Sequence, residues 1–233
     1  LVNNTIDLIE SIGTITGDIQ QEKEEILKKD SCYFHLDSTI NKFIMNKNRV
    51  IPSTGYKCLD DALGGGLYNS LYVVGGITGL GKTSIVLNII ENLAKQNLDV
   101  LFISLEMSRE ELIAKSMARN VREVTDIRYK KSKYLTQKDI ERGNFDVNNA
   151  DFQKALLNYK EASKHIFIKE ANYNYNTEKI REDIINHKML KGKPPILVLD
   201  YLQVLPCLKD YSDDKKNIDF NITELKRISR EFD

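Results

Sequence analysis

The sequence has little of what stabilises secreted proteins or anchors membrane proteins. It contains no tryptophan, three cysteines and three histidines in 233 residues. An odd, widely spaced set of cysteines favours neither a disulfide framework nor a zinc site, and it is typical of a reducing compartment. No apolar run reaches the roughly 20 residues that a membrane helix needs, and residues 1–4 do not begin a signal peptide. We therefore expect a cytoplasmic protein with no membrane partner.

A net charge is also lacking, because 34 basic and 34 acidic side chains cancel. Any nucleic-acid partner must therefore be held by a local basic patch. Hydrophobic residues make up 41% of the chain and charged residues 29%, which is ordinary for a soluble globular protein. A chain of this length and composition can bury a full core without disulfides or metals.

The chain also lacks an initiator methionine, so we expect it to be an excerpt of a longer protein. Residues 1–48 are polar and favour helices, with a short amphipathic stretch near residues 40–44. We predict an N-terminal helical linker segment over residues 1–48, and a plain N-terminal extension remains an equal alternative. Residues 49–233 are predicted to form one compact domain.

Apolar runs alternate with helical periodicity from residue 51 onwards. Strands are predicted at residues 71–74, 100–103, 166–168 and 196–199, each a short apolar run. Between them, apolar residues recur at helical spacing, and Ser108 with Glu111 forms a capping box that predicts a helix start. This order predicts an α/β fold with a mostly parallel sheet flanked by helices.

A glycine-rich loop follows the first predicted strand. Residues 76–83 read GITGLGKT and match the phosphate-loop pattern G-x-x-x-x-G-K-[ST] at every fixed position. Backbone N–H groups of such a loop point at phosphates, and the helix that follows adds the positive end of its dipole. Lys82 would reach the β- and γ-phosphates of ATP, and the Thr83 hydroxyl would bind Mg²⁺. The predicted nucleotide-binding residues here are Gly76, Thr78, Gly79, Gly81, Lys82, Thr83 and Ser84.

Two acids follow other predicted strands. Asp200 ends the strand at residues 196–199, where a magnesium-binding Walker B aspartate belongs. Glu106 follows the strand at residues 100–103 and is a candidate general base. Ligands of open α/β sheets bind beyond the carboxyl ends of the strands, so we expect both acids beside the phosphate loop. The alternatives are a turn aspartate and an acid that leads into a helix.

These segments together resemble a known family. Residues 51–60 (IPSTGYKCLD) resemble the lead-in of RecA-like ATPases, with one extra residue. Residues 102–108 (FISLEMS), 199–203 (LDYLQ) and 224–230 (ELKRISR) resemble the corresponding segments of DnaB-type hexameric helicases. The resemblance runs from about residue 50 to the end. It implies a RecA-like core that serves as an ATP-dependent DNA helicase motor.

The resemblance also implies roles for particular residues. Glu106 would be the catalytic glutamate, while Lys82, Thr83 and Asp200 would hold ATP and Mg²⁺. Gln203 matches a family residue of the nucleotide site. The family assembles as a ring, typically a hexamer, around single-stranded DNA, with ATP between subunits. Its linker helix packs on the neighbouring subunit, and residues 20–48 are the candidates for that contact.

Two features depart from the family. Its phosphate loop usually reads RPSMGKT, whereas this chain has residues 76–83, which suggests a divergent branch from a plasmid, phage or integrated element. Segments that would carry a phosphate-sensing glutamine, a DNA-contacting loop and an arginine finger are missing. An arginine finger contributes roughly a thousandfold or more in rate. We therefore expect this chain to bind ATP but hydrolyse it poorly.

Two other functions remain open. The same core could serve a RecA- or RadA-like recombinase, although the S-L-E-M segment argues against it. It could also serve an ATP-binding loader or regulatory module without turnover. Weaker signals for DNA contact are the basic and aromatic residues 128–134, the tyrosines of residues 172–176, and Lys215 with Lys216. A solvated loop explains residues 128–134 equally well, and a tyrosine-rich surface loop is the favoured interpretation of residues 172–176.

Overall fold

The computed structural model describes residues 19–46, 50–125, 135–208 and 213–232. The chain divides into two compact units, Leu1–Val50 and Ile51–Asp233. In the first unit, residues 19–30 are helical and α2 spans Cys32–Asn46. The large apolar side chains of α2 are exposed: Tyr33, Phe34, Leu36, Ile40, Phe43, Ile44 and Met45. None of the helices in the described ranges is long and apolar enough to cross a bilayer.

The second unit is built on a parallel sheet of three strands. The strands are β1 (Val100–Ser104), β2 (Ile166–Glu170) and β3 (Ile196–Asp200), in the order β2-β1-β3. Ser104 stands opposite Glu170 on one side and Asp200 on the other. Three of the four predicted strands are therefore confirmed, and their carboxyl ends lie at one edge of the sheet.

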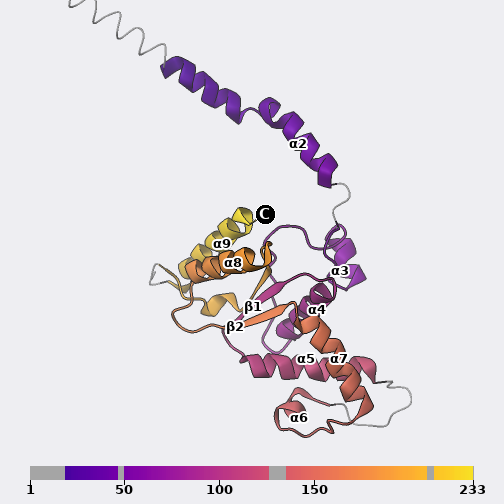
Figure 1. Cartoon of the computed structure of the whole chain (residues 1–233). Coiled ribbons are helices and arrows are strands. Elements are labelled where there is room, and N and C mark those ends of the chain that lie inside the picture. Colours follow the sequence, from indigo (N-terminus) through magenta and orange to yellow (C-terminus); the bar gives the residue numbers. More distant parts are fainter. Residues whose placement is uncertain (1–18, 47–49, 126–134, 209–212, 233) are drawn as a thin grey trace, which may run out of the picture. The chain divides into compact units, whose positions relative to one another are not determined.

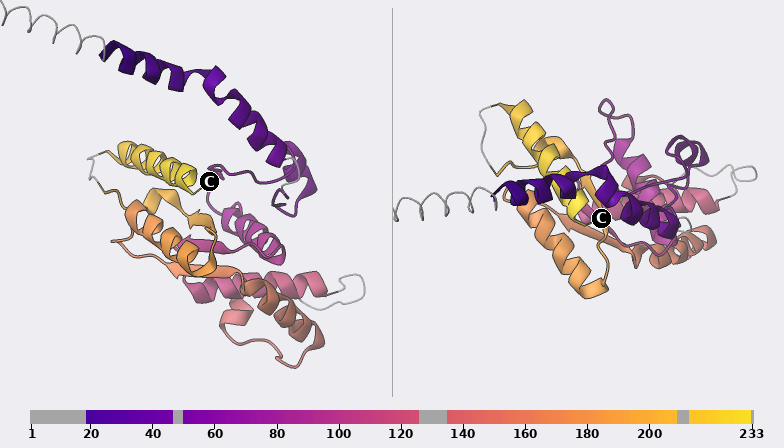
Figure 2. Two further views of the ribbon diagram at one scale, coloured as in Figure 1. Left: turned by 45° about the horizontal axis from the view of Figure 1, so that its top comes forward. Right: turned by 90° about the horizontal axis from the view of Figure 1, so that it is seen from above.

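Helices cover both faces of this sheet (Figure 1). α4 and α5 pack on one face, and α8 and α9 lie side by side on the other, as the two views of Figure 2 also show. The helices of the unit are α3 (Lys57–Ala62), α4 (Lys82–Lys95), α5 (Arg109–Val124), α6 (Gln137–Glu141), α7 (Ala150–Ser163), α8 (Thr177–Lys191), the 3-10 turn η1 (Leu202–Val204) and α9 (Asp214–Glu231).

The central strand explains the two-sided core. Side chains alternate along a strand, so Leu101 and Ile103 pack towards α8 and α9, whereas Val100 and Phe102 pack towards α4 and α5. All of them are buried. A strand buried on both faces reads as a continuous apolar run, which is why the sequence pattern located β1 correctly.

The helix starts follow local capping chemistry. Ser108 accepts a hydrogen bond from the Glu111 amide at 3.2 Å, and the Glu111 carboxylate accepts one from the Ser108 amide at 2.8 Å. The predicted capping box at the start of α5 is therefore confirmed. Asn149 and Asn176 cap α7 and α8 through their side-chain oxygens.

The predicted strand at residues 71–74 is wrong. The segment has no regular secondary structure and pairs with no strand in the described part of the chain. Leu71 packs against the core, whereas Val73 and Val74 are 71% and 54% exposed. An apolar run identifies an extended segment, but only hydrogen bonds to a neighbour make it a strand, and the described strands pair with one another instead.

Candidate nucleotide-binding site

The phosphate loop connects residues 71–75 to α4. Gly79 and Gly81 have φ values of +80° and +96°, in the left-handed region that a side chain disfavours. Gly81 is also the N-cap of α4, so the helix begins directly at Lys82. Thr78 lies in the exposed loop, and Ser84 lies in the first turn of the helix. The glycines thus allow the bend that exposes the amide end of α4 to an anion.

The Lys82 ammonium is oriented by the loop itself. Its Nζ donates hydrogen bonds to the carbonyl oxygens of Gly76 at 2.9 Å and Ile77 at 3.2 Å. A Cβ on Gly76 would lie 3.1 Å from the Leu80 side chain and 3.7 Å from that of Lys82. A side chain at position 76 would therefore crowd Leu80, whereas its contact with Lys82 would be an ordinary one.

The side chains of Thr83 and Asp200 are in contact at the carboxyl end of β3. The Thr83 hydroxyl donates a 2.8 Å hydrogen bond to Oδ2 of Asp200, although the two residues are 117 positions apart. A hydroxyl and a carboxylate side by side are the oxygen donors that Mg²⁺ prefers, together with water and substrate phosphates. The pair therefore fits a magnesium site of the kind predicted for these two residues.

Glu106 lies on the turn that leaves β1. The Leu105 amide donates to the Asp200 carbonyl at 2.8 Å, which holds the turn beside the end of β3. Ser104 closes the turn, because its hydroxyl accepts from the Met107 amide at 3.0 Å and donates to the Met107 carbonyl at 2.6 Å. The Glu106 side chain is exposed and makes no hydrogen bond or ion pair within the described ranges. Its carboxylate is therefore free to engage a water molecule.

The lead-in segment, residues 51–60, is hydrogen-bonded to α4, the helix that follows the phosphate loop. Asp60 accepts hydrogen bonds from the Thr54 amide (2.9 Å) and hydroxyl (2.7 Å) and from the Ser53 hydroxyl (2.5 Å). These hydrogen bonds, that of Ser53 foremost, lower the pKa of Asp60. Asn92 of α4 donates to the Thr54 carbonyl at 2.9 Å. A Cβ on Gly55 would lie 2.0 Å from the Asn92 amide nitrogen, so only glycine permits this contact.

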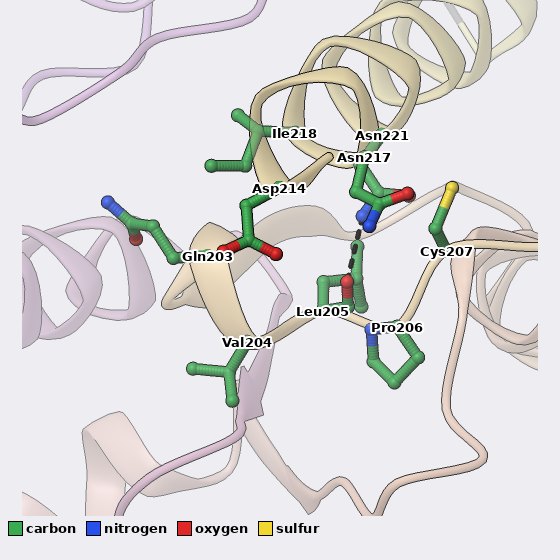
Figure 3. A pocket seen from close by; sticks show the side chains of 9 residues that line it. All are labelled: Gln203, Val204, Leu205, Pro206, Cys207, Asp214, Asn217, Ile218 and Asn221. Atoms are coloured by element: carbon green, nitrogen blue, oxygen red, sulfur yellow. Dashed lines mark hydrogen bonds between the residues drawn. The ribbon is translucent and has the colours of Figure 1, made fainter. Parts of the chain in front are cut away.

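Gln203 lies in η1 and lines a pocket of about 500 Å³. Figure 3 shows the lining residues, which come from η1 and the segment after it on one side and from the first turns of α9 on the other. Asn221, which is buried, donates to the Leu205 carbonyl at 2.8 Å and joins the two sides. No hydrogen bond links Gln203 to the phosphate loop within the described residues, so its predicted role in nucleotide binding stays a prediction.

The weaker DNA signals have different outcomes. Residues 128–134 lie outside the described residues. Lys215 and Lys216 lie exposed in the first turn of α9. Of the tyrosines in residues 172–176, Tyr173 is 93% exposed, but Tyr175 is buried and its hydroxyl donates to Asp183. The interpretation of residues 172–176 as a surface loop is therefore wrong for Tyr175, which is part of the hydrophobic core.

Two polar groups escaped the sequence reasoning. Glu170 ends β2 at the same edge as Asp200, and its Oε1 accepts a 2.7 Å hydrogen bond from the Arg109 amide. A weak signal was present, since Glu170 follows the apolar run at residues 166–168 after a single lysine. At the opposite edge, Asp99 lies between His165 Nδ1 (2.6 Å) and His187 Nε2 (3.0 Å). The residues next to His165 and His187 in the sequence give no sign that Asp99 is their partner.

Known proteins resemble this chain over most of its length or over part of it. A "Probable replicative DNA helicase" from Trieres chinensis is 28% identical over 182 residues, which cover 77% of this chain and 37% of that protein. The chain thus spans little more than a third of this relative. A "DNA repair protein RadA" from Campylobacter jejuni is 46% identical over 61 residues, 26% of this chain and 14% of that protein.

Two solved structures share the architecture. A solved ATPase domain superposes with a TM-score of 0.70 at 20% identity, covering 87% of this chain and 68% of that one. A structure titled "The Structure Of A DnaB-Like Replicative Helicase And Its Interactions With Primase" superposes with a TM-score of 0.68, also at 20% identity, covering 85% of this chain and 45% of that one. These likenesses show the RecA-like fold.

The family of the chain follows from its sequence. The family model described as "DnaB-like helicase C terminal domain" matches residues 52–233, which is most of the chain. The matched range includes the phosphate loop, Glu106 and Asp200. The chain therefore belongs to the family of DnaB-like helicase C-terminal domains.

Proposed function

We propose that this domain is an ATP-driven DNA helicase motor that couples ATP hydrolysis to movement along single-stranded DNA. The observation that carries the proposal is the hydrogen bond between Thr83, which follows the lysine of the phosphate loop, and Asp200, 117 positions away. The family membership supports a motor of this class. Single-stranded DNA as the substrate and movement along it both belong to this proposal.

In the proposed mechanism, the amides of the loop and of the first turn of α4 bind the phosphates of ATP. Lys82 leaves the carbonyls of Gly76 and Ile77 and places its charge on the β- and γ-phosphates. A lysine held only by neutral carbonyls can be recruited by an anion, because a phosphate adds a charge–charge attraction that a carbonyl oxygen lacks.

Thr83 and Asp200 would hold Mg²⁺ through their adjacent oxygens. When bound, the metal supplies positive charge beside the phosphate oxygens. Glu106 accepts a proton from the attacking water or orients that water for attack. Within the described residues its exposed carboxylate has no hydrogen-bond or ion-pair partner, which supports this role.

The proposed partners are single-stranded DNA and further copies of the chain in a ring, with a hexamer as the expected size. The exposed apolar side chains of α2 support a role for this helix in contact with another subunit. Lys215 and Lys216, both exposed, are the proposed DNA contacts in the described residues.

The test is ATP hydrolysis by the purified protein, with and without single-stranded DNA, for the wild type and for Glu106→Gln. We expect Glu106→Gln to abolish DNA-stimulated turnover and to leave ATP binding intact. Glu110→Gln is the matched control, since Glu110 is an exposed acid in the first turn of α5. Tight binding without any DNA-stimulated turnover in the whole protein would favour a loader or regulatory module.

The second candidate is a recombinase ATPase, which the similarity to the RadA protein supports. Both candidates predict DNA-stimulated ATPase activity, so turnover cannot separate them. A forked duplex with one single-stranded arm does separate them. Unwinding by discrete rings indicates the helicase, whereas filaments that exchange strands indicate the recombinase.

A further inference from the structure

The carboxyl edge of the sheet carries a third acid besides Asp200 and Glu106. Glu170, the last residue of β2, stands opposite Ser104 of β1. Its Oε1 accepts a 2.7 Å hydrogen bond from the backbone amide of Arg109, 61 positions away. The Arg109 guanidinium donates in return to the Ile168 carbonyl at 3.1 Å. The first residue of α5 is therefore tied twice to β2.

These bonds bear on the position of Glu106. On its N-terminal side, the Leu105 amide binds the Asp200 carbonyl at 2.8 Å. On its C-terminal side, the Arg109 amide binds the Glu170 carboxylate. Glu106 thus lies between two contacts that fix the turn to the neighbouring strands, one on each side of β1. The other amide contacts of the turn remain within the turn and the capping box.

A carboxylate is a suitable acceptor for the Arg109 amide. The first amides of a helix have no partner inside the helix. The Ser108 hydroxyl serves the amide of Glu111, and the Arg109 amide is left for another acceptor. An ionised carboxylate at a helix N-terminus also interacts favourably with the helix dipole.

From this geometry we propose that Glu170 is a positioning residue that holds the turn carrying Glu106 in place for ATP hydrolysis. The inference rests on the proposed function, since it assigns Glu106 the role given there. Glu170 acts through the backbone of α5 and not on the substrate. It needs an acceptor oxygen for this role and does not need a charge.

The kinetic test compares Glu170→Ala with Glu170→Gln in the purified protein with single-stranded DNA. A reacting group misplaced by about 1 Å can lose roughly 100-fold in rate. We expect Glu170→Ala to lower kcat by about 10- to 100-fold, with the KM for ATP and the melting temperature close to wild type. Glu170→Gln keeps an acceptor oxygen and should retain most of kcat. Glu110→Ala removes a carboxylate from the same helix turn without removing the contact, and should match wild type.

Two kinetic results would overturn the inference. An unchanged kcat in Glu170→Ala would show that the contact does not position Glu106. An equal loss in Glu170→Gln and Glu170→Ala would show that the negative charge acts directly, as for a base or a metal ligand.

A second measurement separates this inference from the proposed function. Hydrogen exchange of the Arg109 amide, followed by NMR without nucleotide, should accelerate about tenfold or more in Glu170→Ala and stay slow in Glu170→Gln. If the wild type does not hydrolyse ATP, the proposed function fails, and the exchange rate still decides whether Glu170 holds the turn. Unchanged exchange in Glu170→Ala would overturn the inference whatever the ATPase result.

Discussion

The Thr83 hydroxyl donates a 2.8 Å hydrogen bond to the Asp200 carboxylate and thereby joins the start of α4 to the end of β3. The contact is the centre of the candidate site, because it brings together the hydroxyl and the carboxylate that we propose as ligands of Mg²⁺. Neither side chain alone would make such a site.

Replacing the Thr83 hydroxyl should weaken magnesium-dependent nucleotide binding. Thr83→Val keeps the shape but removes the oxygen, so we expect the affinity for Mg·ATP to fall about 10- to 100-fold. Affinity for ATP in the presence of a chelator should change much less. Titration of a fluorescent ATP analogue with and without Mg²⁺ measures both values. Thr83→Ser is the control, and equal affinities for Thr83→Val and Thr83→Ser in Mg²⁺ would argue against the site.

A buried ion pair joins α4 to α5. Glu91 is 1% exposed, pairs with Arg119, and accepts a 2.8 Å hydrogen bond from Asn120. Burial raises the pKa of Glu91, and the charge of Arg119 only partly opposes this. Arg119→Met would leave the carboxylate buried without its cation, and we expect a loss of about 3 kcal/mol or more in the free energy of unfolding.

This loss should depend on pH. A carboxyl whose pKa is raised by folding contributes stability that is present at low pH and is lost as the pH rises through its folded pKa. Without Arg119 the pKa of Glu91 rises further, so the deficit of Arg119→Met should grow between about pH 5 and pH 8. Urea unfolding at both values measures it. The double variant Glu91→Leu with Arg119→Met should recover much of the stability, and a deficit that does not change with pH would contradict this account.

The opposite edge of the sheet has a carboxylate between two histidines. Partial burial opposes ionisation of Asp99, but hydrogen bonds from His165 and His187 outweigh it and lower the pKa of Asp99. Asp99→Asn should therefore lower the free energy of unfolding at pH 7, by about 1–2 kcal/mol. Asp61→Asn, in an exposed pair with Lys57, is the control and should change it by less than about 1 kcal/mol.

The stability that Asp99 contributes should depend on pH in the opposite direction to that of Glu91. A carboxyl with a lowered folded pKa contributes stability that is complete above its unfolded pKa, about 3.9, and is lost as the pH falls through the folded value. The difference between wild type and Asp99→Asn should therefore shrink below about pH 4. Thermal unfolding between about pH 3 and pH 7 tests this, and a difference that widens in acid would refute it.

Much of the fold was predictable because its signals are local. β1, β2 and β3 read as short apolar runs because both faces of the sheet are covered. The start of α5 was predictable because Ser108 and Glu111 satisfy each other within one turn. The segment at residues 71–74 was misread for the same reason, since its apolar residues resemble those of a strand but no described strand pairs with it.

Partners far apart in sequence were harder to predict. Tyr175 reads as part of a polar loop, yet it is buried in a core that β1 and α9 help to form. Glu170 reads as the end of a strand, and its acceptor role depends on where α5 begins. Each of these contacts joins elements whose relative position the local sequence does not contain.

Local patterns were enough to locate the phosphate loop, the helix that follows it and the acids at two strand ends, because glycines, a lysine and apolar periodicity act over a few residues. The contacts of Thr83 with Asp200 and of Glu170 with the turn beside Glu106 depend instead on how the chain folds in three dimensions. The register of β2-β1-β3 makes those contacts possible, because it places the ends of β2 and β3 at the same edge of the sheet. Glu170 there meets Arg109, which is 61 positions away, and Asp200 meets Thr83, which is 117 positions away.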